Sequence, residues 1–133
     1  MKTELQNKLF DKYPKIFVQK DLEIDTGDGW YNILDTLCGQ IQNLNLLERF
    51  NVEATQVKEK FGGLRFYYNG GDEFIEGLTS MAEAISNRTC EECGSPGTQN
   101  NAGWVRTRCP SYWSDVALQN QAHQDSLKVK NEE

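Results

Sequence analysis

The chain has 133 residues, of which 14 are lysine or arginine and 20 are aspartate or glutamate, giving a net charge of −6. This length predicts a single domain with a small core, and the negative charge disfavours non-specific attraction of the whole chain to nucleic acid. We find no long apolar run and no leader sequence. We therefore expect a cytoplasmic protein without membrane association, in which the four cysteines bind metal more readily than they form disulfides.

The N-terminal part contains one predicted helix and one less regular segment. Apolar side chains recur on one side of residues 3–13, which predicts an amphipathic helix that Pro14 ends. Residues 16–24 mix apolar and charged side chains, so we predict a short irregular strand there. An acidic run of the kind usually found in solvated loops overlaps this segment, and its members are Asp21, Glu23, Asp25 and Asp28.

The clearest predicted element is a helix that begins near Trp30, with Asp28 as its N-terminal cap. Apolar residues recur at intervals of three and four from Trp30 to Phe50. This pattern predicts one buried stripe over about six turns. Cys38 lies within the stripe, so we expect it to be a small buried side chain rather than a metal ligand.

Residues 52–68 have the pattern of a β-hairpin, with two extended runs on either side of a glycine turn at residues 61–63. Strand alternation places Leu64, Phe66 and Tyr68 on one face and charged side chains on the other. The ordinary interpretation is a sheet with one core face and one charged face. The alternative is a platform of basic and aromatic side chains that binds nucleic acid.

A second long helix is predicted to begin after Asp72, whose side chain can cap it, and to end near Arg88. Its predicted apolar side consists of Phe74, Ile75, Leu78, Met81, Ala82 and Ile85.

Three cysteines near the C-terminal end have the spacing of a structural zinc site. Cys90 and Cys93 are separated by two residues and followed by a glycine, the pattern of a knuckle in which both thiolates face one metal ion. Cys109 supplies a third ligand. The region 88–113 therefore predicts a zinc-ribbon-like end, in which residues 103–108 form a short strand.

The spacing does not give the fourth zinc ligand directly. Tyr112 stands three residues after Cys109, where the second member of a ligand pair is expected. His123 is our first choice, because it is the only histidine and a neutral imidazole completes a three-cysteine tetrahedron. Cys38, water or a neighbouring molecule are the alternatives.

These elements predict an α+β domain over residues 1–118, followed by a polar tail over residues 119–133. Two principal amphipathic helices and a shorter N-terminal one are expected to pack on a small antiparallel sheet with a central β-hairpin.

We recognise no catalytic motif in the chain. A nucleophile elbow, a phosphate-binding glycine loop and a zinc-deaminase signature are all missing from the sequence. Zinc with an open fourth position is one route to hydrolysis, and a carboxylate-dependent nuclease is another. We consider both of these enzymatic functions less well supported by the sequence than a function without catalysis.

Several motifs resemble those of a family of small phage and prophage proteins. They are Asp28-Gly29-Trp30, Leu37-Cys38, the run QVKEKFGGLRFY at residues 56–67, Cys90-x2-Cys93-Gly94-x-Pro96-Gly97 and Gly103-Trp104-x4-Cys109. The resemblance covers roughly residues 28–112 and implies a mobile-element origin more strongly than an activity. In that family the last cysteine commonly begins a second ligand pair, whose partner position here is Tyr112.

A mobile-element origin implies a class of functions. Small acidic phage proteins without catalytic motifs are often inhibitors of host defence, including anti-CRISPR proteins. The analogy between this chain and those inhibitors rests on the class of protein and not on particular residues. We therefore expect the chain to bind a host protein such as a CRISPR nuclease and to block nucleic-acid access with acidic surfaces. The residues expected to do so are Asp21, Glu23, Asp25, Asp28, Asp72, Glu73, Glu76, Glu91 and Glu92. The alternative is a nucleic-acid-binding zinc module with a local basic face made of Lys58, Lys60, Arg65, Arg106 and Arg108.

Overall fold

The computed structural model describes residues 1–100 and 103–113, which form an α+β fold as predicted. The elements in chain order are α1 (Thr3–Lys12), β1 (Ile24–Asp25), the 3-10 turn η1 (Asp28–Trp30), α2 (Tyr31–Leu46), β2 (Glu53–Lys60), β3 (Gly63–Asn69), α3 (Glu73–Ser86), β4 (Thr98–Gln99), β5 (Thr107–Arg108) and the 3-10 turn η2 (Pro110–Tyr112). The boundary predicted at residue 118 and the predicted tail lie outside the described residues.

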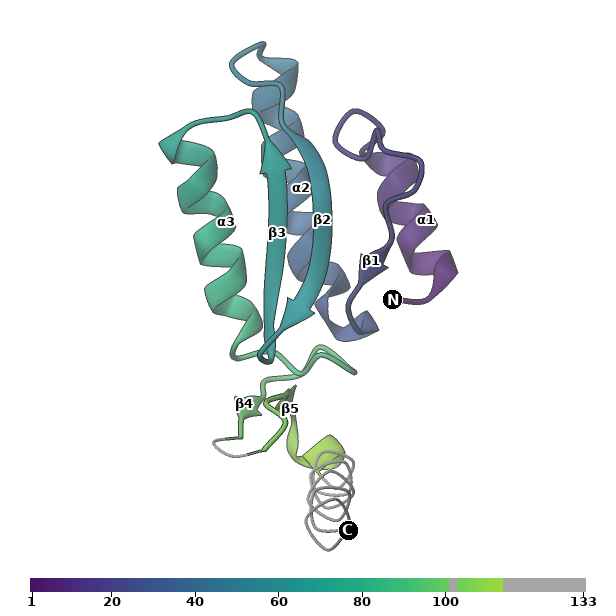
Figure 1. The fold of residues 1–133 in the computed structure, drawn as a ribbon, viewed down its shortest axis with the longest axis vertical. Coiled ribbons are helices and arrows are strands. Elements are labelled where there is room, and N and C mark those ends of the chain that lie inside the picture. The colour runs from purple at the N-terminus through teal and green to yellow at the C-terminus, as the bar shows by residue number, and fades with distance from the viewer. Residues whose placement is uncertain (101–102, 114–133) are drawn as a thin grey trace, which may run out of the picture.

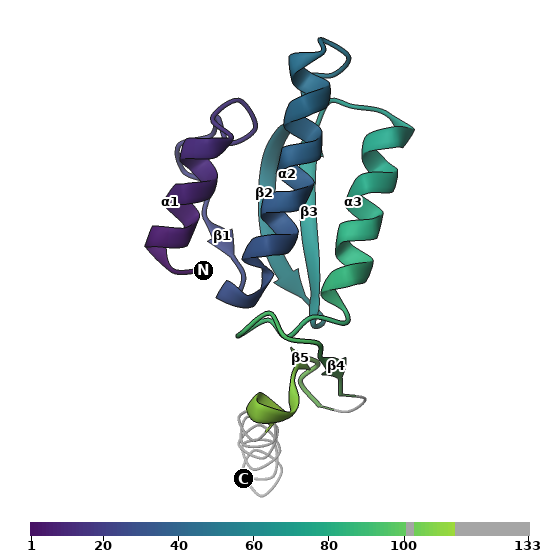
Figure 2. The same cartoon turned by 180° about the vertical axis from the view of Figure 1, so that it is seen from behind.

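Helices α2 and α3 cover one face of the β2–β3 hairpin, and α1 lies beside β1 (Figure 1, and from behind in Figure 2). The larger sheet has the order β1-β2-β3, in which β2 and β3 are antiparallel. The predicted hairpin is therefore confirmed. Strand β1 pairs parallel to β2, because the chain crosses from one to the other through α2. The sequence did not predict this parallel edge.

The segment predicted as a strand over residues 16–24 is mostly a loop, in which some apolar side chains are buried and the charged ones are exposed. Only Ile24 belongs to β1, where it is in register with Val57. Ile16 and Leu22 are buried without strand pairing, and the Ile16 carbonyl accepts a hydrogen bond of 2.8 Å from the Ala54 N–H. Scattered apolar residues fill a core from a loop as well as from a strand, so the pattern alone did not distinguish the two.

Helix α2 buries its apolar stripe as predicted as far as Ile41, but it ends at Leu46 and is shorter than the sequence pattern indicated. Glu48 has a φ of 57°, a conformation that cannot continue a helix. The Asn45 side chain accepts a hydrogen bond of 3.1 Å from the Val52 N–H. These local polar contacts turn the chain toward β2, and periodicity carries no signal for them.

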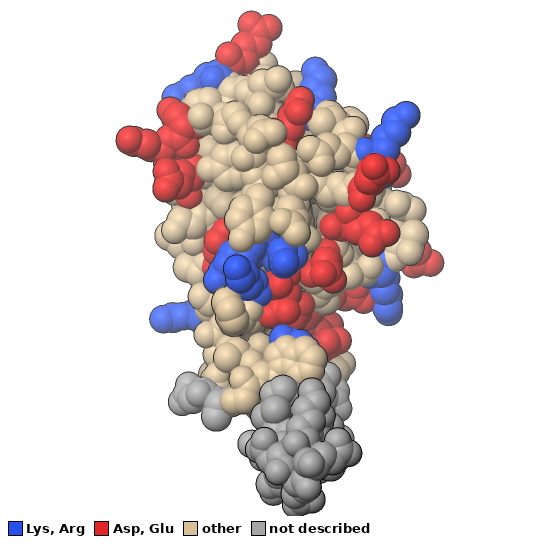
Figure 3. Space-filling model, viewed as in Figure 1, with Lys and Arg blue, Asp and Glu red and all other residues tan. Residues whose placement is uncertain are grey.

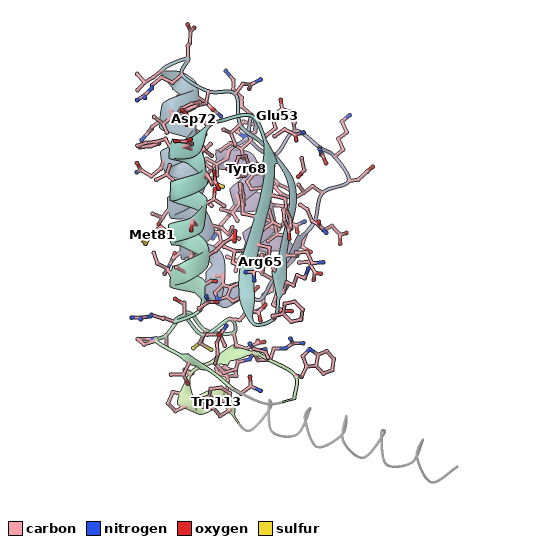
Figure 4. The ribbon with its side chains drawn as sticks, turned by 60° about the vertical axis from the view of Figure 1, so that its left-hand side comes forward. Glu53, Arg65, Tyr68, Asp72, Met81 and Trp113 are labelled. Carbon is pink, nitrogen blue, oxygen red and sulfur yellow. The ribbon has the colours of Figure 1, made fainter. Side chains whose placement is uncertain are left out.

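Helix α3 begins as predicted, since Asp72 accepts a hydrogen bond of 2.9 Å from the Phe74 N–H. Ile75 and Ala82 of the predicted side are buried, but Thr79 and Ser86, which were not predicted, complete the side that faces the core. Three residues predicted to be buried, Phe74, Met81 and Ile85, are 54%, 62% and 47% exposed. Met81, labelled in Figure 4, lies with Ile85 along a groove of about 320 Å³ between α2 and α3.

Helix α3 also covers the outer edge of β3. The Ser86 hydroxyl accepts a hydrogen bond of 2.9 Å from the Leu64 N–H, and the Glu83 carboxylate accepts one from the Phe66 N–H. Burial raises the pKa of Glu83. An uncovered edge strand can pair with another chain, and these bonds remove that possibility along part of β3. They also fix the hairpin so that its turn points toward the cysteines.

Candidate metal centre

Three cysteine side chains meet at the end of the molecule that carries β4 and β5. In Figure 1 this end lies beyond the turn of the hairpin. The Sγ atoms of Cys90, Cys93 and Cys109 all lie within 4.8 Å of one another, and those of Cys93 and Cys109 are 3.6 Å apart. Cys90 and Cys109 are buried and Cys93 is exposed. Three thiols at these distances can hold one metal ion, as their spacing predicted.

Backbone geometry around the first two cysteines explains how they converge. Gly94 has a φ of 81°, which favours glycine, and its N–H donates to the Cys90 carbonyl at 2.9 Å. The antiparallel β4–β5 pair then returns the chain, so that Cys109 follows directly after β5. The strand predicted over residues 103–108 is limited to its last two residues, and the sequence did not predict its partner β4.

Hydrogen bonds to sulfur and burial set the protonation of the cysteines. The Ser95 hydroxyl and N–H donate to the Cys93 sulfur and lower the pKa of Cys93 to about 7. Burial raises the pKa of Cys109. The Ser111 N–H donates to the Cys109 sulfur and lowers this pKa, but its effect is smaller than that of burial. A bound metal ion needs thiolates and displaces the remaining protons, so metal affinity should increase as the pH rises through neutrality.

The described residues add no further cysteine, histidine or carboxylate to this group of three. Cys38 lies in the apolar core with no exposed surface, and burial raises the pKa of its thiol well above the usual range. Its prediction as a core residue is confirmed, and its alternative role as a metal ligand is wrong. His123, the first choice for the fourth ligand, lies outside the described residues.

The cysteine knuckle packs directly on the turn that starts α2. The Gly29 N–H donates to the Glu91 carbonyl at 2.7 Å, and the Trp30 indole N–H donates to the Thr89 carbonyl at 2.9 Å. A Cβ on Gly29 would lie 2.1 Å from the Cys90 carbonyl oxygen, so a side chain there would force the two segments apart. The turn and the knuckle therefore form one structural unit, although 60 or so residues separate them in the chain.

A buried ion pair crosses the same junction. The Arg108 guanidinium donates to Glu91 at 3.2 Å and to Glu92 at 3.1 Å, and the side chains of Arg108 and Glu91 are each 8% exposed. The Glu91 carboxylate also accepts a hydrogen bond of 2.9 Å from the Gly27 N–H. Two predictions are therefore wrong: Glu91 does not belong to an exposed acidic surface, and Arg108 does not belong to a basic face. Residue type predicts charge, but only the fold decides that these two charges neutralise each other.

The hairpin turn is attached to the cysteine end as well. The Thr107 hydroxyl donates to the Gly62 carbonyl at 2.6 Å, and the Gly62 N–H donates to the Glu59 carboxylate at 2.7 Å. The same Glu59 oxygen lies 3.4 Å from the Arg106 guanidinium. Arg106 is thus ion-paired, and it contributes less to a basic face than the sequence predicted.

The exposed residues among those predicted to form an acidic surface lie in two separate places. Asp21, Glu23 and Asp25 are exposed in and before β1, and Gly27 joins this segment to the knuckle that carries Glu92. We call Asp21, Glu23, Asp25 and Glu92 the acidic edge. Figure 3 shows acidic side chains along this side of the molecule. Asp21, Glu23 and Asp25 form no ion pair with any described residue.

The other predicted acidic residues lie apart from this edge. Asp72, Glu73 and Glu76 are exposed at the start of α3, and Figure 4 labels Asp72 at the opposite end of the molecule from Trp113. Asp28 is half-buried and its carboxylate accepts a hydrogen bond of 2.8 Å from the Lys2 N–H. The predicted acidic residues therefore do not form one face.

The basic residues of the hairpin lie within a mixed row of charges. Lys58 is in register with Asp25 of β1 on one side and with Arg65 of β3 on the other. Arg65 also lies near Glu83, where its positive charge lowers the pKa of the Glu83 carboxyl. Burial raises that pKa, and its effect is the larger one. Lys60 is exposed. Figure 3 shows basic side chains gathered on the lower hairpin with acidic ones beside them. The local basic face of the sequence prediction is thus smaller and partly neutralised.

No family model, no curated protein and no solved structure matches this chain. The resemblance to phage and prophage proteins therefore stays a prediction. Among the described residues, no helix has both the length and the apolar character needed to cross a membrane.

Proposed function

We propose that this chain is a zinc-stabilised binding protein of mobile-element origin, without enzymatic activity, that inhibits a host immune effector. The observation that best supports it is the acidic edge beside the three cysteines. Three of its carboxylates, on Asp21, Glu23 and Asp25, have no cationic partner among the described residues. Their charge is therefore available to a basic surface of another protein.

Zinc is the metal that we propose for the three cysteines, because tetrahedral sites rich in thiolate select zinc. Its role is structural. The knuckle is bonded to the segment after β1 through Glu91 and Gly27, so a metal-ordered knuckle holds the acidic edge in one arrangement. A pre-ordered edge loses less conformational entropy when it binds.

A CRISPR effector nuclease is the partner class that we propose. Its guide–target duplex lies in a positively charged channel, where an acidic edge can compete with DNA. Direct nucleic-acid binding by this chain has weaker support, because Arg106 and Arg108 are paired with Glu59 and Glu91. Repulsion between the net charge of −6 and phosphate opposes it further.

The test is inhibition of target-DNA cleavage by a panel of purified, guide-loaded CRISPR nucleases. We expect Asp21→Lys/Glu23→Lys to weaken inhibition by about tenfold or more, because two attractive charges become repulsive. The matched control is Glu73→Lys/Glu76→Lys, which makes the same charge change at the other end of the molecule. Zinc content and melting temperature should stay unchanged in the first variant.

Two results would contradict the proposal. One is the lack of inhibition of any nuclease in the panel by the wild-type protein. The other is equal loss of inhibition in both double variants, since that would reflect net charge rather than the acidic edge. A gel-shift assay with single-stranded and double-stranded DNA tests the nucleic-acid alternative.

A further inference from the structure

The turn of the hairpin contains a conflict between backbone and side chain. Phe61 and Gly62 have φ values of 53° and 78°, as in a type I′ turn, in which asparagine or glycine is normally preferred at the first position. A bulky residue is an outlier in this conformation. The Phe61 side chain is nevertheless 70% exposed, so the strain is not offset by burial. Folding stability alone gives no reason for phenylalanine at this position.

The surrounding contacts hold the strained turn in place. Glu59 and Thr107 bind the N–H and the carbonyl of Gly62 at 2.7 and 2.6 Å. Thr107 has no exposed surface and lies two residues before Cys109, so the metal centre helps to order the contacts that fix the turn. Strained conformations persist where neighbouring structure determines them, and they cluster at binding sites.

Further aromatic and basic side chains lie near Phe61. The Lys60 ammonium is 5.6 Å from the centre of the Phe61 ring, and the Arg106 guanidinium is 4.7 Å from that of Trp104, which is 51% exposed. The segment with Trp104 and Arg106 lies beside the turn, because a Cβ on Gly62 would lie 3.3 Å from the Arg106 backbone. We call Lys60, Phe61, Trp104 and Arg106 the hairpin tip.

We propose that the hairpin tip is a docking surface for a protein partner and that Phe61 enters an apolar pocket of that partner. Aromatic and arginine side chains dominate the binding energy of protein interfaces, and a rigid turn presents them at low entropic cost. The acidic edge continues from the tip, since Asp25 is in register with Lys58, two residues before Lys60. The pocket is therefore bordered by lysine or arginine on the side that faces β1.

A nucleic acid fits the tip less well. Arg106 shares its charge with Glu59, and the acidic edge would repel a phosphate backbone beside the tip. This inference rests on the proposed function in one respect, since it requires a protein partner. That partner does not have to be a CRISPR nuclease.

The first experiment replaces Phe61 with the photo-crosslinker p-benzoylphenylalanine in the full chain, expressed in cells of the proposed bacterial host. The matched control has the same crosslinker at Phe74, which is 54% exposed on α3. We expect an adduct with one protein from position 61 and none from position 74, identified by mass spectrometry of the crosslinked band.

The second experiment uses that crosslinked protein in purified form. Phe61→Asn keeps a residue suited to the turn and removes the aromatic ring. We expect the Kd to rise about tenfold or more, the usual effect of losing a central interface residue, while the melting temperature is unchanged or higher and the zinc content is unchanged. Phe74→Asn should leave the Kd unchanged.

The outcomes separate this inference from the proposed function. A protein adduct at position 74 only, or an unchanged Kd for Phe61→Asn, would overturn the docking role of the tip and leave the proposed function intact. A nucleic-acid adduct at position 61 would also overturn it. A position 61 adduct with a protein outside host immunity would support the tip and contradict the proposed inhibition. No adduct at either position would overturn the docking role of the tip, and the cleavage assay would still test the proposed function.

Discussion

The body of the molecule, residues 3–86, and the cysteine end, residues 87–113, are stabilised by different interactions. The body has a continuous apolar core, with side chains from α1, α2, α3 and the hairpin. At the cysteine end, the buried residues among those that the structure describes are Cys90, Glu91, Thr107, Arg108 and Cys109. Because none of these is a large apolar side chain, hydrophobic burial contributes little there. A buried ion pair and close backbone contacts take its place, together with the metal that we propose for the three cysteines.

The comparison also shows where the two regions depend on each other. The cysteine end holds the hairpin turn through Thr107 and holds the start of α2 through Glu91 and Thr89. Loss of the metal should therefore loosen the hairpin tip and the acidic edge before it affects the core. Three substitutions test this division of roles, in order of decreasing effect.

The largest effect is expected for Cys90→Ser, which removes a buried metal ligand. The variant should lose its zinc and several kcal/mol of metal-binding free energy, because the unfolded chain has no preformed site. Hydrogen exchange should become fast over residues 87–113, while the backbone of α2 and the hairpin strands stays protected. Cys38→Ala is the control, since it opens a small cavity in the core and should keep full zinc content. Equal protection of both regions in Cys90→Ser would show that the metal is not what holds the cysteine end.

A medium effect is expected for Gly29→Ala, which tests the junction between the two regions. The added Cβ would lie 2.1 Å from the Cys90 carbonyl oxygen, so the contact must open at a cost of about 1–3 kcal/mol in the free energy of unfolding. Zinc affinity should fall as well, because the displaced segment carries Cys90. Gly77→Ala is the matched control, because a Cβ there meets nothing within 4 Å and should stabilise α3 by about 0.5–1 kcal/mol. Chemical denaturation and competitive zinc titration measure the two quantities.

The smallest effect is expected for Asp35→Asn, which lies wholly in the body. Asp35 accepts hydrogen bonds from the Tyr13 hydroxyl at 2.5 Å and the Lys12 ammonium at 2.9 Å, and these lower the pKa of Asp35. A lowered carboxyl pKa contributes stability above the unfolded pKa of about 4, and this stability is lost as the pH falls through the folded pKa.

At pH 7 the Asp35→Asn variant should therefore be less stable by about 1 kcal/mol, and the difference from wild type should disappear at low pH. Zinc content should not change. Asp11→Asn, at an exposed position on α1, is the control. A constant difference from pH 7 down to pH 2 would mean that the Asp35 charge contributes nothing.

Much of the body could be predicted from the sequence, because its elements are encoded locally. The Asp72 cap, the hairpin with its glycine turn and the buried stripe up to Ile41 all follow from neighbouring residues. The errors arose where hydrogen bonds and packing that apolar periodicity does not encode outweigh the periodic pattern. Helix α2 ends where Asn45 bonds to Val52, and α3 turns its small residues toward the core.

The candidate site divides in the same way. Cysteine spacing predicted that Cys90, Cys93 and Cys109 would meet, since two of them are neighbours on a tight turn. It did not predict the burial of Glu91 and Arg108, because a charged residue type is normally exposed and only a partner across the junction explains the exception.

By itself, the sequence determined the α+β class, the main helices, the hairpin and the three cysteines that could hold a metal ion, because periodicity, turn glycines and cysteine spacing are local properties. Only the tertiary structure decided which charges remain available. It paired Arg108 with Glu91 and Arg106 with Glu59, separated the two acidic clusters, and left Phe61 exposed on a strained turn. Ion pairing and side-chain exposure depend on residues far apart in the chain, so local sequence patterns do not predict them.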